Sequence, residues 1–74
     1  MEYPIFNIKY GTLSNAYCNA VVAEESSDNA KHLLENKFEG QKLDRWKITQ
    51  TDFSANKKGI IFDTNKYNKD LPKI

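Results

Sequence analysis

The amino-acid sequence predicts an α+β domain: an antiparallel four-stranded sheet with one helix on one face, in the chain order ββαββ. Three observations predict it. One segment has helical spacing and capping residues at its ends, two alternating runs precede it, and two apolar runs follow it. The helix carries a single apolar stripe, so it can bury only one side. It is therefore expected to lie across one face of the sheet.

The first two runs predict a hairpin. Tyr3 to Tyr10 alternates, with Phe6, Ile8 and Tyr10 on one face and Asn7 and Lys9 on the other. Residues 11–15 favour a turn. In the second run, Ala16 to Ala23, one face consists of Cys18, Ala20 and Val22, and the other of Tyr17, Asn19 and Val21. Two alternating runs joined by a short turn are typical of paired antiparallel strands.

The helix is predicted over Ser26 to Phe38. Ser26 or Ser27 can cap its N-terminus, where acidic residues also favour the helix dipole. Its stripe has the spacing i, i+3, i+4, i+8 and consists of Ala30, Leu33, Leu34 and Phe38. Gly40 suits the left-handed conformation that ends many helices.

The third and fourth strands are predicted at Leu43 to Thr51 and at Gly59 to Asp63, with a loop from Asp52 to Gly59 between them. Periodicity is lost from Thr64 onward. We therefore expect a single domain over residues 1–63 and a partly ordered tail over 64–74. The large core residues expected from these patterns are Phe6, Ile8, Val22, Leu33, Leu34, Phe38, Trp46, Ile48, Ile60 and Phe62.

Composition limits the classes of function. The 74 residues allow one thin core, so a deep enclosed pocket is not expected. Cys18 is the single cysteine, no run reaches the roughly 20 apolar residues of a membrane span, and the N-terminus lacks an apolar signal segment. These features predict a cytoplasmic protein with no membrane association.

No catalytic residues, metal site or cofactor are predicted. His32 is expected at the solvent or boundary side of the helix, and Cys18 as a small buried hydrophobe; a dyad of the two remains open. One cysteine and one histidine leave a zinc site two ligands short, and the isolated glycines form no phosphate-binding loop. The chain is thus expected not to be an enzyme.

Charge and aromatic residues point to surfaces instead. Residues 1–40 carry three lysines and six carboxylates, whereas residues 41–74 carry eight basic and four acidic residues. The sheet face without the helix is a candidate interaction surface or dimer interface, because Tyr, Trp and Arg contribute strongly to interfaces. The candidate partner-binding residues are Tyr17, Asn19, Arg45, Lys47, Lys57 and Lys58. An acidic patch around the helix is a third possible surface.

The segment from Val21 to Ala30, leading through Leu33 and Leu34 to the later Gly-Ile-Ile-Phe strand, resembles small accessory proteins of phages and mobile elements. Small anti-CRISPR proteins are similar in size and organisation, and the likeness spans residues 3–63. The resemblance implies a cytosolic stoichiometric binder that blocks a larger host assembly without chemistry of its own, and it assigns no functional residues.

The function expected from these observations is that of a small non-enzymatic protein-binding module, either a monomer or a homodimer. The resemblance implies, more specifically, a phage or mobile-element inhibitor of a host complex. The alternative is a nucleic-acid-binding accessory protein that uses the basic second half, through Arg45, Lys47, Lys57 and Lys58.

Overall fold

The structure is a computed structural model that describes residues 2–12, 17–38 and 43–65. Its elements are β1 (Tyr3–Thr12), β2 (Cys18–Ala23), α1 (Ser27–Lys37), β3 (Leu43–Ala55) and β4 (Gly59–Asp63). The predicted α+β class, with an antiparallel four-stranded sheet, one helix and the chain order ββαββ, is confirmed.

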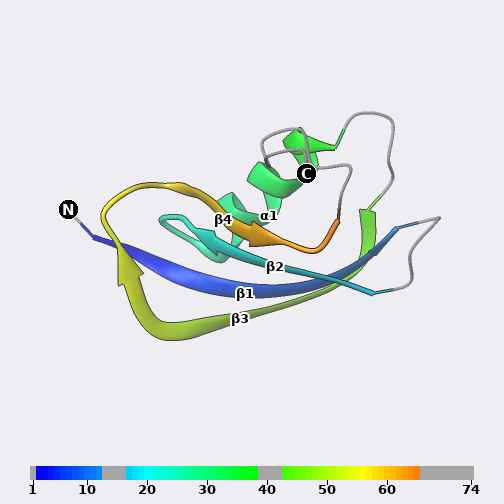
Figure 1. The fold of residues 1–74 in the computed structure, drawn as a ribbon. Coiled ribbons are helices and arrows are strands. Elements are labelled where there is room, and N and C mark those ends of the chain that lie inside the picture. The colour runs from blue at the N-terminus through cyan, green and yellow to red at the C-terminus, as the bar shows by residue number, and fades with distance from the viewer. Residues whose placement is uncertain (1, 13–16, 39–42, 66–74) are drawn as a thin grey trace.

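The spatial order of the strands is β3-β1-β2-β4, so β3 and β4 form the two edges. Both β2 and β3 pair antiparallel with β1 and therefore run parallel to each other. Parallel strands require a crossover, which α1 supplies. Figure 1 shows α1 on one side of the curved sheet, leaving the other side uncovered.

The short connection from β3 to β4 crosses the ends of both central strands. Ala55 of β3 pairs with Tyr3, whereas Gly59 of β4 pairs with Ala23 of β2. Figure 1 shows the chain bending past the start of β1. Lys58 lies at this crossing: its Nζ is 2.6 Å from Oε1 of Glu25 and 5.4 Å from the centre of the Tyr3 ring. The hydrogen bond to Glu25 raises the pKa of Lys58.

The start of α1 follows the predicted capping chemistry. Ser26 has an extended backbone, and its hydroxyl accepts a hydrogen bond from the Asn29 N–H at 3.1 Å. Such a cap satisfies one of the backbone donors that the first helical turn leaves unpaired.

We expect Ser26→Ala to lower the free energy of unfolding by about 1 kcal/mol, because it removes this cap. Ser27→Ala is the matched control: Ser27 is exposed and already helical, so alanine there should be neutral or slightly stabilising. Urea denaturation of the two variants measures the difference. Equal destabilisation by both would contradict the assignment of Ser26 as the cap.

The core lies between α1 and one face of the sheet. The predicted residues Phe6, Ile8, Val22, Leu34 and Phe38 are buried there, while Leu33, Trp46, Ile48 and Ile60 are partly buried against them. Tyr10 belongs to the core as well, with 1% of its surface exposed. Its ring stacks on Trp46 at 5.5 Å between centroids and contacts Phe38 at 5.9 Å.

The prediction that Phe62 belongs to the core is wrong, because its side chain is 54% exposed. A register shift in β4 explains the error. Val22 pairs with Ile60, but Val21 pairs with Phe62, so Ile61 is an extra residue at a β-bulge. The bulge reverses the alternation after Ile60. Phe62 consequently faces away from α1, and Asp63 is buried.

The predicted end of the third strand and the loop after it are also wrong, since β3 continues to Ala55. Pro4 pairs with Ser54, and a register shift separates this pairing from that of Phe6 with Gln50. The Thr51 hydroxyl donates to the Ile5 carbonyl at 2.8 Å within the irregular stretch. Pairing with the start of β1 thus overrides the local turn propensity of Asp, Ser and Asn.

Candidate functional site

The face of the sheet away from α1, here called the open face, has two central rows of side chains. One row, across β3, β1, β2 and the residue after β4, contains Lys47, Lys9, Asn19 and Thr64. The other contains Thr49, Asn7, Val21 and Phe62. Val21 is partly buried and the other seven are exposed. None of these eight positions holds a carboxylate.

Two lysines lie next to each other at one corner of the open face. Lys9 of β1 pairs directly with Lys47 of β3. Side chains at such positions have Cβ atoms about 4.5–5.5 Å apart, and like charges there repel. With Asn7 and Thr49 they line a small hollow of about 150 Å³. This lysine corner, formed by Lys9 and Lys47, is suited to an anionic group.

The opposite corner of the open face is apolar. Val21 and Phe62 pair across β2 and β4, and Ile61 at the bulge is 53% exposed. By strand spacing and residue rise, this pair lies about 12 Å from the lysine pair. The open face therefore combines a basic corner with an apolar one.

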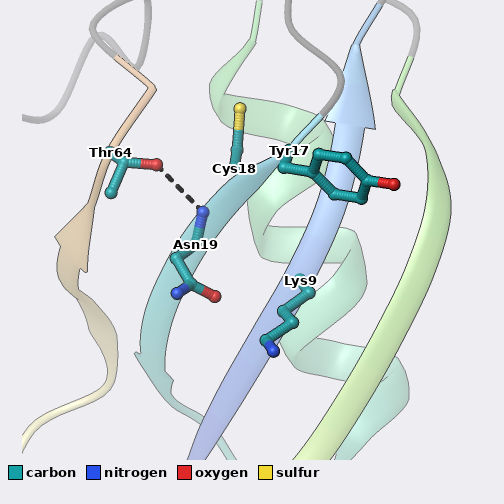
Figure 2. A pocket seen from close by; sticks show the side chains of 5 residues that line it. All are labelled: Lys9, Tyr17, Cys18, Asn19 and Thr64. Carbon is teal, nitrogen blue, oxygen red and sulfur yellow. Dashed lines mark hydrogen bonds between the residues drawn. The ribbon is translucent and has the colours of Figure 1, made fainter.

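Tyr17 lies on the open face directly before β2, two residues from Asn19. Its side chain is 85% exposed, and with Lys9, Cys18, Asn19 and Thr64 it lines an open hollow of about 460 Å³. Figure 2 shows α1 behind the strands, with the Tyr17 ring and the Lys9 side chain in front of them. The Asn19 N–H donates to the Thr64 hydroxyl at 2.9 Å, which fixes one wall.

Arg45 differs from Lys9 and Lys47 because its guanidinium already interacts with other groups of the fold. Its backbone has φ 55°, a conformation that L-residues seldom adopt, at a register shift between β1 and β3. The guanidinium lies 3.1 Å from the Asp44 carboxylate and donates to the Thr12 carbonyl at 3.1 Å. It also covers Gly11, where any Cβ would clash with it. Arg45 thus closes the end of the β1–β3 pair.

Lys57 and Lys58 lie far from the lysine corner. They belong to the connection between β3 and β4, beside the start of β1. Six residues of β1 separate that end from Lys9, or about 20 Å at the rise of a strand. Of the six predicted partner-binding residues, the structure brings Tyr17, Asn19 and Lys47 together on the open face. Arg45 lies two residues from Lys47, but its guanidinium is engaged by Asp44 and the Thr12 carbonyl. Lys57 and Lys58 lie at the opposite end of the sheet.

Under the open face, a buried polar cluster joins the ends of β1 and β4. Asp63 is 6% exposed, and the Tyr10 hydroxyl lies 2.8 Å from each of its carboxylate oxygens. The Asn65 N–H donates to the same carboxylate at 2.8 Å. Burial raises the pKa of Tyr10, and the hydrogen bond to Asp63 and its negative charge raise it further. This cluster fixes the chain directly after β4.

The two predicted nucleophile and base candidates lie in different environments. Cys18 is buried, as predicted, and burial and the charge of Asp63 raise the pKa of its thiol. It is therefore kept as the weakly nucleophilic thiol. His32 is exposed on α1, as predicted. Among residues 2–12, 17–38 and 43–65, no group of three or more His, Cys, Asp or Glu side chains is placed to hold a metal ion.

Sequence reasoning did not nominate Lys9, Asn7, Thr49 or Phe62. The alternation in the first run did place Lys9 and Asn7 on the polar face, and this was the sequence feature that could have identified them. Their neighbours on β3 depend on the register of a pair more than 35 residues apart in the chain.

No helix within the described part of the chain is long and apolar enough to cross a membrane. No protein-family model, curated protein or solved structure matches this chain. Its function is therefore inferred from the geometry of the open face.

Proposed function

We propose that the protein is a small non-enzymatic module that binds a protein partner through the open face. The observation that carries the proposal is the composition of that face. It presents an exposed tyrosine, an exposed phenylalanine and a lysine pair on a sheet whose other side is covered by α1. In the inhibitory form implied by the resemblance to phage accessory proteins, it blocks a larger assembly by stoichiometric binding.

Two properties of the open face support this role. Aromatic side chains contribute much of the binding energy of protein interfaces, and Tyr17 and Phe62 are 85% and 54% exposed. They are also carried on paired strands or directly beside one, so binding requires little ordering of the chain. A rigid, mixed polar and apolar face of this kind suits a protein surface.

The structure of the two edge strands makes them less suitable than the open face for binding a partner. Edge strands that bind partners present a regular ladder of unpaired backbone groups. Here β4 is five residues long and carries a bulge, and β3 is interrupted by two register shifts. Irregular edges of this kind discourage strand addition.

The test compares two double variants as bait in extracts of the source cells. Tyr17→Ala with Phe62→Ala should weaken retention of the bound partner about tenfold or more, since each aromatic contact is worth at least about 1 kcal/mol at an interface centre. His32→Ala with Glu35→Ala, two exposed positions on α1, is the matched control and should retain it. Retention of the same proteins by both variants would contradict the proposal.

The nucleic-acid-binding alternative requires four basic residues to act together. Arg45 is paired with Asp44, and Lys58 with Glu25, while Lys57 lies at the far end of the sheet from Lys47. Affinity for a phosphate backbone rises with the number of phosphates neutralised, so a divided set binds weakly. Salt-sensitive binding of DNA or RNA that is lost in Lys57→Glu with Lys58→Glu would favour this alternative.

A further inference from the structure

We infer that the lysine corner, formed by Lys9 and Lys47, is the anchor for a carboxylate-bearing segment of the protein partner. Neighbouring apolar side chains of that segment cover Val21 and Phe62. This inference rests on the proposed function and adds the chemistry of the partner: an acidic segment with apolar residues beside the acidic ones.

The first step is the charge of the corner. Lys9 and Lys47 are direct cross-strand neighbours, an arrangement in which like charges destabilise the pair. The eight positions of the two rows contain no carboxylate, and neither lysine forms an ion pair with another described residue. Asp44, which pairs with Gly11 in the next row, is already engaged by Arg45 at 3.1 Å. An anion placed between the two ammonium groups relieves their repulsion and gains two charge-assisted hydrogen bonds.

The second step is the shape and polarity of the corner. The hollow between the lysines is also lined by Asn7 and Thr49, whose amide and hydroxyl groups can both donate hydrogen bonds. At about 150 Å³ it accommodates a carboxylate rather than a large ring system. Four side chains that can donate hydrogen bonds thus line a hollow of the size of one or two carboxylates.

The third step distinguishes a protein segment from a nucleic acid. The lysine corner offers two cations, and the whole chain has a net charge of +1, whereas nucleic-acid-binding domains present larger basic surfaces. Val21 and Ile61 beside Phe62 are aliphatic, which suits apolar side chains better than the base stacking that clustered aromatic residues provide. Charge complementarity and the apolar corner together favour an acidic peptide.

The test uses a defined probe, an acetylated peptide of four glutamates followed by two leucines, titrated into the ¹⁵N-labelled protein at low salt. The amides of Asn7, Lys9, Lys47 and Thr49 should shift first, with smaller shifts at Val21 and Phe62. A second peptide with glutamine in place of each glutamate should bind at least about fivefold more weakly. Absence of shifts at the lysine corner would overturn the inference.

Substitutions that remove one charge each locate the site. Lys9→Gln and Lys47→Gln should each weaken peptide binding about fivefold. Lys57→Gln is the matched control, because Lys57 is also exposed but lies near the other end of the sheet, and it should change the affinity less than twofold. An equal effect of all three would mean that only net charge matters and would overturn the inference.

Two other occupants give different results. Tighter binding of a twelve-nucleotide oligothymidylate at the same amides would identify a nucleic-acid site. Salt-sensitive self-association in sedimentation, lost in Lys9→Gln, would identify a second copy that docks its acidic helix surface. Either result overturns the inference.

If the glutamate peptide fails to bind while Tyr17→Ala with Phe62→Ala still releases the cellular partner, the proposed function stands without this inference. If the peptide binds as expected but the aromatic variant retains every partner, the proposed function fails.

Discussion

Leu34→Ala should lower the free energy of unfolding by about 3 kcal/mol. Leu34 has no exposed surface and belongs to the core between α1 and the sheet. Removing a buried leucine side chain loses its transfer free energy and leaves a cavity, at a typical cost of about 2–5 kcal/mol. A domain of this size has a total stability of only about 4–11 kcal/mol. The variant should therefore melt about 15 °C lower, as measured by circular dichroism.

Leu33→Ala is the matched control for this prediction. The same atoms are removed from the neighbouring position of the same helix, but Leu33 is only partly buried. Its cost should be less than half that of Leu34→Ala, because less apolar surface returns to water. Comparable losses for the two variants would show that the helix packs on the sheet in a different rotation.

The sequence predicts the elements and the helical stripe because both depend on local periodicity. Ala30, Leu34 and Phe38 follow the 3.6-residue spacing and are buried, and Ser26 is the cap. Phe62 shows where this reasoning ends. Alternation assigns it to the core, but one inserted residue at the bulge turns it to the open face, and no local signal marks the insertion.

The lysine corner was beyond sequence reasoning for a related reason. Lys9 and Lys47 become neighbours only through the strand order β3-β1-β2-β4, which sets the third strand beside the first. A basic cluster read along the chain instead joined Lys47 to Lys57 and Lys58. The structure separates these by the length of the sheet, because the crossing connection carries Lys57 and Lys58 to the start of β1. Spatial charge patterns in a sheet follow register rather than sequence distance.

The second large effect concerns the buried carboxylate. Tyr10→Phe should lower the free energy of unfolding by about 2–3 kcal/mol at neutral pH. The substitution keeps the ring packed against Trp46 and Phe38 but removes the hydroxyl that donates to Asp63. Taking away one partner of a buried charged group costs the desolvation of that group as well as the hydrogen bond. Chemical denaturation measures the loss.

Asp63→Asn separates the charge from the hydrogen bond. The asparagine carbonyl can still accept from Tyr10, and no buried charge is left when the hydroxyl is removed. Tyr10→Phe should therefore cost about 1 kcal/mol less in the Asp63→Asn background than in the wild type. Additive effects of the two substitutions would mean that the contact at 2.8 Å contributes no coupling energy.

Alkaline pH should reduce the difference in free energy of unfolding between the wild type and Tyr10→Phe. Burial and Asp63 hold the pKa of Tyr10 above its ordinary value of about 10, so above that pH the unfolded chain loses a proton that the folded chain retains. The contribution of Tyr10 to the free energy of unfolding is fully present below pH 10. It then falls by about 1.4 kcal/mol per pH unit until the folded pKa is reached. Tyr10→Phe lacks this proton, whereas Cys18, whose pKa is raised by burial and by Asp63, is present in both proteins. Denaturation at pH 9, 10 and 11 should show the wild type converging on the variant, and a constant difference across that range would exclude the buried hydroxyl as its source.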